Sequence, residues 1–126
     1  FLEAPLTGGL ELLKAGLMTV LVGGSKEDMA TYRPVFDAYA ATVLHMGDVG
    51  AASTVKIVSN QLCAVHAVVT GEALTLCKAH GVNMTAAFDG IRASAGNSYV
   101  FETEAPLCMN GTFDPGFAIK LHVKDV

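Results

Sequence analysis

The stretch that decides the fold is GDVGAASTVKIVSN, residues 47–60, in which Gly47 and Gly50 precede a long apolar segment. From Val49 to about Ala79 the only helix breaker after Gly50 is Gly71, so the sequence predicts a single helix of about 30 residues, on the order of 45 Å long. A helix of that length usually spans two domains or packs against a partner chain. We therefore expect the chain to change its character near Gly47.

Before Gly47, short apolar runs alternate with polar segments. Ser25 is expected to cap a helix, with Asp28 in the capping-box position three residues later. The predicted order is strand 1–6, helix 11–14, strand 17–22, helix 26–40 and strand 42–46. The second helix should bury one side, made of Met29, Tyr32, Val35 or Phe36, and Tyr39. Alternating strands and helices indicate an α/β layer.

After the long helix, which should stop at His80-Gly81, only helices are predicted. They cover about 83–95 and 99–109, the second interrupted near Pro106. Residues 117–125 alternate in hydrophobicity like a strand but also place apolar and charged residues on one helical face, so strand and helix both stay open. The fold class we expect is an α/β remnant followed by an all-α domain.

Composition excludes several kinds of protein. Hydrophobic residues make up 52% of the chain and charged residues 16%, which suits a packed core or interface and not a disordered chain. The net charge is −4 and the eight Lys and Arg are scattered, so no nucleic-acid partner is expected. The longest uncharged run, 57–71, contains several polar residues and is shorter than the ~20 apolar residues of a membrane span. Small molecules and other subunits are the expected partners.

Three cysteines, Cys63, Cys77 and Cys108, lack both CxxC and Cys/His ligand spacing, so buried free thiols in a reducing compartment are expected. The four histidines converge on no motif, and we expect no metal site. The expected location is the cytoplasm, or the mitochondrion if a presequence stands upstream of Phe1.

Lys56 and Asn60 lie four residues apart in the predicted long helix and therefore share one face, with Cβ atoms about 5–6 Å apart. Both side chains can then reach one small oxygen-bearing molecule. Apolar residues flank Lys56, and burial in a partly apolar cleft would lower the pKa of its ammonium group and make it a proton donor near neutral pH. On spacing alone the alternative stays open: a solvated lysine whose stem lies on apolar surface, beside an exposed asparagine.

Four segments, in this order and spacing, resemble the β-hydroxyacid dehydrogenase family. EAPLTGG (3–9) is similar to the substrate-binding motif DAPVSGG, and residues 47–60 are similar to the pattern GxVGxGxxxKxxxN. Gly-Glu-Ala at 71–73 is the third segment, and Asp-Pro-Gly-Phe at 114–117 leading to Lys-Asp at 124–125 resembles the family's GF…KD segment. The resemblance covers essentially the whole chain.

The resemblance implies an oxidoreductase that passes a hydride between NAD or NADP and a small β-hydroxy acid or semialdehyde. Lys56 matches the catalytic lysine, which acts as general acid or base, and Asn60 matches the residue that orients lysine and substrate. Thr7, Gly8 and Gly9 match the segment that binds the substrate carboxylate, and backbone N–H groups at a glycine-rich helix start do suit an anion. A plain strand-to-helix turn is the alternative for this segment.

Toward the end of the chain, Phe117 and Asp125 match positions that line the closed site, and Lys124 matches a position at the cofactor. Core packing is the alternative for Phe117. The resemblance also implies that residues 1–47 are the last strands of a Rossmann-like NAD(P)-binding domain. Residues 48–126 would be a truncated helical domain that carries catalysis and dimerisation, with the long helix between the two domains.

Three positions depart from the family pattern: Thr7 stands where serine is commoner, Ala52 replaces a glycine and Ser59 an asparagine. The chain has no GxGxxG loop for the cofactor phosphates, which in this family lies upstream of Phe1. Since the chain also begins without Met and stops without a helix cap, we expect an internal fragment of a longer enzyme, with little activity alone.

Two rival functions remain. A non-catalytic relative would keep the fold as an oligomerisation or scaffold module, but a scaffold needs neither Lys56 nor Asn60. A 6-phosphogluconate-type dehydrogenase would need more cationic side chains for the substrate phosphate than the two arginines, Arg33 and Arg92, provide.

Overall fold

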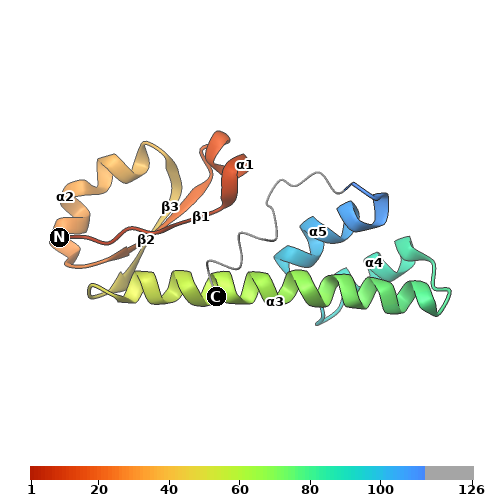
Figure 1. Ribbon diagram of the computed structural model, residues 1–126. Coiled ribbons are helices and arrows are strands. Elements are labelled where there is room, and N and C mark those ends of the chain that lie inside the picture. The colour runs from red at the N-terminus through yellow and green to blue at the C-terminus, as the bar shows by residue number, and fades with distance from the viewer. Residues whose placement is uncertain (113–126) are drawn as a thin grey trace. The chain divides into compact units, whose positions relative to one another are not determined.

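The computed structural model describes residues 1–112 (Figure 1). It divides into two compact units, one covering Phe1–Asn60 and the other beginning at Gln61. The elements are β1 (Leu6–Thr7), α1 (Gly9–Lys14), β2 (Met18–Gly23), α2 (Lys26–Asp37), β3 (Ala40–Gly47), α3 (Ala51–Ala79), α4 (Met84–Arg92) and α5 (Tyr99–Asn110). The expected α/β part followed by helices is therefore confirmed at this level, and the strand-or-helix question at 117–125 lies outside the described residues.

The sheet of the first unit has the order β1-β2-β3. β2 and β3 are parallel and are connected through α2, which makes residues 18–47 a βαβ unit. β1 runs antiparallel to β2, with Thr7 opposite Thr19, and an isolated bridge pairs Glu3 with Gly23. Residues 3–7 thus lie along the whole length of β2, so the expected first strand is present although regular pairing covers only its end.

The core of the first unit lies between α2 and the sheet. Val20 and Val22 are fully buried and pack with Phe36 and Val43. Of the two candidates on α2, Phe36 faces the core, whereas Val35 and Tyr32 are more than half exposed, so the expectation for Tyr32 is wrong. The helix begins as predicted, because the Ser25 hydroxyl accepts a hydrogen bond from the Asp28 N–H at 3.0 Å.

α3 is the predicted long helix, 29 residues without a break. It ends where expected, because Gly81 adopts a φ of +70° that few other residues accept, and the Val82 N–H reaches back to the Cys77 carbonyl at 3.0 Å.

The second unit is helical over its described residues. Leu74 of α3 packs with Phe101 and Ala105 of α5, and the Phe88 ring of α4 stacks on Phe101 at a centroid distance of 5.5 Å. α5 continues through Pro106, so the predicted interruption is wrong. Proline removes one hydrogen bond but does not end the helix, which continues to Asn110 and is followed by Gly111 with a φ of +68°.

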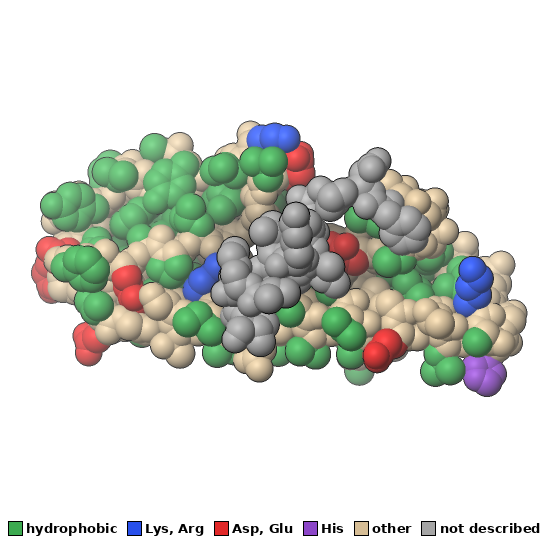
Figure 2. Space-filling view, in the orientation of Figure 1, with side chains coloured by type: hydrophobic (Ala, Val, Ile, Leu, Met, Phe, Trp, Pro, Cys, Tyr) green, Lys and Arg blue, Asp and Glu red, His purple; other side chains and the backbone are tan. Residues whose placement is uncertain are grey.

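Hydrophobic side chains are exposed along α3 (Figure 2): Val55, Ile57, Val58, Leu62, Val65, Val68, Val69 and Leu76. By length and composition alone α3 could cross a membrane, although its uncharged run at 57–71 is shorter than a membrane span. One such helix is weak support for a membrane, because helices of soluble proteins can be equally long and apolar.

The expected burial of the thiols is wrong for Cys108, which is exposed.

Replacing Phe36 by alanine should lower the free energy of unfolding by about 3–5 kcal/mol, because it leaves a cavity against Val20 and Val22. Tyr32→Ala, on the exposed side of the same helix, is the matched control and should change the free energy of unfolding by less than about 0.5 kcal/mol. Urea denaturation followed by circular dichroism measures both. Equal losses in the two variants would contradict the described packing of α2.

Candidate functional site

Lys56 and Asn60 lie on the inward side of α3. Ala52, one turn before Lys56, is fully buried, and both Lys56 and Asn60 are half-buried. The residues on either side of Lys56 point outward, and Ile57 is 59% exposed. A lysine held inward while its apolar neighbours face solvent reverses the usual pattern for a solvated helix.

The Thr7-Gly8-Gly9 segment forms the turn from β1 into α1. Gly8 and Gly9 have φ values of +141° and +73°, which side chains rarely allow, and a Cβ on Gly8 would stand 2.9 Å from the sulfur of Met18. Gly8 and Gly9 are exposed, while the Thr7 side chain is half-buried. The two glycines are therefore required by the turn and leave their backbone accessible.

Glu3 is the residue that the sequence reasoning missed. Its Oε1 accepts hydrogen bonds from the N–H groups of Gly50 at 2.7 Å, Ala52 at 2.8 Å and Ser53 at 3.3 Å. Its Oε2 accepts a hydrogen bond from the Ser53 hydroxyl at 2.6 Å. A carboxylate at a helix N-terminus satisfies N–H groups that have no partner within the helix and is favoured by the helix dipole.

The hydrogen bond from the Ser53 hydroxyl is the largest cause of a Glu3 carboxyl pKa below the usual value of 4.5. Desolvation opposes it, and the backbone N–H groups of Ser53, Gly50 and Ala52 each lower the pKa by a smaller amount. These contacts also explain two sequence features. Ala52 replaces the family's glycine, yet its N–H still bonds Glu3 and α3 still begins at Ala51. The second feature is the glycine at position 23, which is needed because a Cβ there would overlap the Glu3 carboxylate.

The structure places the two predicted site segments in one unit, because Thr7–Gly9 and Lys56–Asn60 both belong to Phe1–Asn60. In Figure 1 residues 3–7 and the first turns of α3 both run from left to right within this unit. Glu3 and Gly23 lie at the carboxyl end of β2, whereas Thr7 lies beside its amino end. The other predicted site residues, Phe117, Lys124 and Asp125, lie outside the described residues.

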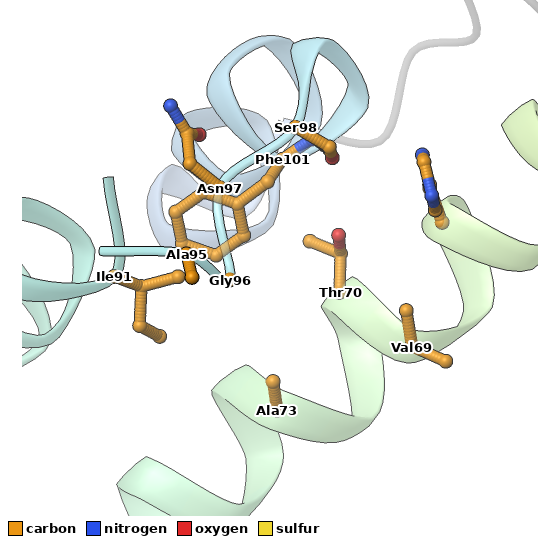
Figure 3. A pocket seen from close by; sticks show the side chains of 10 residues that line it. Val69, Thr70, Ala73, Ile91, Ala95, Gly96, Asn97, Ser98 and Phe101 are labelled. Atoms are coloured by element: carbon orange, nitrogen blue, oxygen red, sulfur yellow. Dashed lines mark hydrogen bonds between the residues drawn. The ribbon is translucent and has the colours of Figure 1, made fainter. Parts of the chain in front are cut away.

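A cavity of about 300 Å³ lies within the second unit, between α3 and the segment from α4 to α5 (Figure 3). Thr70, only 4% exposed, faces it together with Asn97, Ser98 and the Phe101 ring. Of the site residues predicted from the sequence, none of those within residues 1–112 lines this cavity. Among residues 1–112, no three His, Cys, Asp or Glu side chains are grouped in a way that would hold a metal ion.

Comparison with protein families identifies the chain. Residues 50–126, more than half of its length, match the family model described as the NAD-binding domain of NADP-dependent 3-hydroxyisobutyrate dehydrogenase. The chain belongs to the β-hydroxyacid dehydrogenase family. Residues 1–47 match a second model, described as the NAD binding domain of 6-phosphogluconate dehydrogenase. Both descriptions support NAD or NADP as the cofactor of this β-hydroxyacid dehydrogenase family member.

Individual relatives agree with the family. L-threonate dehydrogenase of Haemophilus influenzae is 36% identical over 126 residues, which cover 99% of this chain and 42% of the relative. A probable 3-hydroxyisobutyrate dehydrogenase of Mycobacterium tuberculosis is 30% identical over 99% of this chain and 45% of its own. The chain thus spans less than half the length of these relatives.

Solved structures of the family superimpose on most of the chain. The 3-hydroxyisobutyrate dehydrogenase of Salmonella typhimurium has a TM-score of 0.85 and 36% identity, covering 98% of this chain and 44% of its own. The Mycobacterium tuberculosis enzyme, solved with L-serine, has a TM-score of 0.89 and 30% identity, covering 98% and 45%. The β-hydroxyacid dehydrogenase fold therefore extends over nearly all of the chain.

The lowered pKa of Glu3 gives a stability that depends on pH. Its contribution is fully present above the usual carboxyl value of 4.5 and is lost as the pH falls through the lower pKa of the folded state. Glu3→Gln should therefore flatten the acid side of a plot of unfolding free energy against pH, measured by urea denaturation. Glu104→Gln, on the exposed surface of α5, is the control. Unchanged acid sensitivity in Glu3→Gln would contradict the assignment.

Proposed function

We propose that the whole protein is an NAD(P)-dependent dehydrogenase that transfers a hydride between the nicotinamide and a small β-hydroxy acid or semialdehyde, with Lys56 as the general acid or base. The observation that carries this proposal is the inward placement of Lys56 and Asn60 on α3, among outward apolar neighbours, in a member of this family. The named relatives act on small hydroxy acids, L-threonate and 3-hydroxyisobutyrate, which supports this substrate class.

In the reductive direction the carbonyl carbon gains a hydride and its oxygen becomes an alkoxide. The Lys56 ammonium donates a proton to that oxygen, which leaves a hydroxyl group and a neutral lysine; in oxidation the neutral lysine takes the proton back. Asn60, one turn along the same face, holds the lysine or the substrate oxygen in line through its amide. The expected low pKa of Lys56 remains a prediction.

The turn at Thr7, Gly8 and Gly9 is proposed to bind the substrate carboxylate. Its support is the exposed backbone of the two glycines and their positive φ values, which permit close approach of an anion to the N–H groups. The Thr7 hydroxyl offers one further donor. Holding the carboxylate here would orient the reacting carbon toward the lysine.

We propose that the main surface for the dinucleotide lies outside residues 1–112. The sequence has no GxGxxG loop, and the first N–H groups of α3 already bond the Glu3 carboxylate, so that helix start is not open to a phosphate. The nicotinamide supplies or accepts the hydride, and we propose that other parts of the whole protein bind its phosphates, with Lys124 contributing at the cofactor. Phe117 and Asp125 are proposed to line the same site.

We also propose the domain division at residues 47 and 48, with α3 between the two domains. The exposed apolar side chains of α3 then suit contact with the rest of the whole protein and with a second copy in a homo-oligomer, and no membrane is needed. The bacterial dehydrogenase relatives support a cytoplasmic location. The chain by itself should show little turnover.

The 6-phosphogluconate alternative has one supporting observation, the family model matched by residues 1–47. The two arginines weaken it. Arg33 bonds Asp37 at 2.6 Å within α2, and Arg92 stacks over the Phe88 ring in the second unit, 6.0 Å from its centroid. Both guanidinium groups thus have partners on their own helices.

In the whole protein, Lys56→Ala should lower kcat by about 10²–10⁴-fold, because the proton donor is lost. The assay compares reduction of glyoxylate, succinic semialdehyde, tartronate semialdehyde and methylmalonate semialdehyde with NADH and with NADPH. Lys78→Ala, an exposed lysine in the last turn of the same helix, is the matched control and should keep normal turnover. Equal turnover in Lys56→Ala and wild type would contradict the role of Lys56, and no turnover of the wild type with any of these pairs would favour the scaffold function.

A further inference from the structure

Glu3 connects the two segments that carry the proposed site residues. Its backbone lies in the strand segment that leads into the Thr7–Gly9 turn, four residues downstream. Its side chain bonds the first turn of α3, and Lys56 follows Ser53 by three residues in that helix. One residue therefore joins the strand that leads to the turn with the start of the helix that carries Lys56.

The backbone half of this connection is held by the sheet. The Glu3 N–H donates to the Gly23 carbonyl and the Gly23 N–H donates to the Glu3 carbonyl, each at 3.0 Å. The Leu21 N–H continues the pairing with the Pro5 carbonyl at 3.0 Å, and Thr7 then faces Thr19. Glu3 and the substrate turn are thus two points on one hydrogen-bonded strand.

The side-chain half sets the position of the helix. The N–H groups of Gly50 and Ala52 and the hydroxyl of Ser53 converge on one carboxylate within 2.6–2.8 Å, distances typical of hydrogen bonds to a charged acceptor. A charged acceptor at this end also benefits from the helix dipole. Because a helix is stiff, fixing its first turn fixes the place of Lys56 one turn later.

Gly23 supports this connection independently. It lies in β2 without a positive φ, so backbone conformation does not require a glycine there. A Cβ at this position would stand 2.8 Å from the Glu3 Cγ and would overlap its carboxylate. The glycine is needed because the Glu3 side chain crosses over it on the way to α3.

The two segments also advance by similar lengths from this connection. Four extended residues from Glu3 to Thr7 cover about 13 Å, and seven helical residues from Ser53 to Asn60 cover about 10 Å. Both run in the same direction in Figure 1. The connection therefore sets how far along α3 the substrate turn lies.

We propose that Glu3 is a positioning residue for the proton transfer: its carboxylate holds the start of α3 against the strand so that Lys56 meets the substrate bound at Thr7–Gly9. This inference rests on the proposed function. Both carboxylate oxygens of Glu3 accept hydrogen bonds from the first turn of α3, so we expect Glu3 to act on turnover only through Lys56.

The test is a double-mutant cycle in the whole protein with Glu3→Ala and Lys56→Ala. Glu3→Ala should lower kcat roughly 10–100-fold, as a small displacement of a catalytic group does, with little change in KM, because the backbone pairing of the substrate strand does not depend on the side chain. In the Lys56→Ala background, Glu3→Ala should lower kcat only slightly further. Glu3→Gln keeps an oxygen acceptor and a donor for Ser53, and should restore most of kcat.

Circular dichroism checks that each variant is folded. If Glu3→Ala does not fold, Ser53→Ala replaces it in the cycle, because it removes only one of the contacts, and a smaller but equally non-additive loss is expected. An equal fold-loss in both backgrounds would mean a merely structural role and would overturn the inference. A normal kcat in Glu3→Ala together with a low kcat in Lys56→Ala would overturn the inference about Glu3 and leave the proposed function standing. Normal kcat in Lys56→Ala would overturn the proposed function and this inference with it.

Discussion

Hydrogen bonds from the first turn of α3 converge on the carboxylate of Glu3, and the arrangement of the first unit depends on them. The parallel pair β2 and β3 ends in glycines that lie side by side, Gly23 and Gly47. Gly23 leaves room for the Glu3 side chain, and Gly47 leads the chain out of the sheet toward α3. The carboxylate thus lies where an edge of the sheet and the start of a helix meet.

This arrangement relates the chemistry of the family to the packing of this chain. The inward face of α3 carries Ala52, Lys56 and Asn60 at successive turns, and the buried Ala52 is also one of the residues that bond Glu3. A larger residue than alanine would disturb that face. The substitution of alanine for the family's glycine is therefore tolerated because a single methyl group fits and the N–H remains available.

Local signals were enough to predict much of the fold. The Ser25 cap, the βαβ alternation and the stop of α3 at Gly81 depend on residues close together in sequence, and all three are present. The side of α2 that faces the core was predicted only in part, because Tyr32 and Phe36 are both compatible with a helical stripe and only packing against the sheet selects Phe36. The continuity of α5 through Pro106 is likewise decided by packing, not by local propensity.

Lys56 and Asn60 could be proposed from the sequence because a motif carries them, and their roles remain predictions. Glu3 could not be proposed in this way, because its partners lie 47 to 50 residues away in sequence and nothing in its local surroundings distinguishes a capping carboxylate from a surface one. The sequence around Gly23 did not show why a glycine is needed there either. The reason is the Glu3 carboxylate, which lies where a Cβ of residue 23 would stand.

In the proposed reaction Lys56 transfers a proton to the substrate oxygen. A crystal structure of the whole protein with a nicotinamide cofactor and a bound hydroxy acid tests it most directly, through the distance from the Lys56 Nζ to the substrate hydroxyl oxygen. We predict a hydrogen bond of about 2.6–3.2 Å, with the substrate carboxylate at the Thr7–Gly9 turn. A substrate bound with its hydroxyl beyond the reach of Lys56, even through one water, would contradict it.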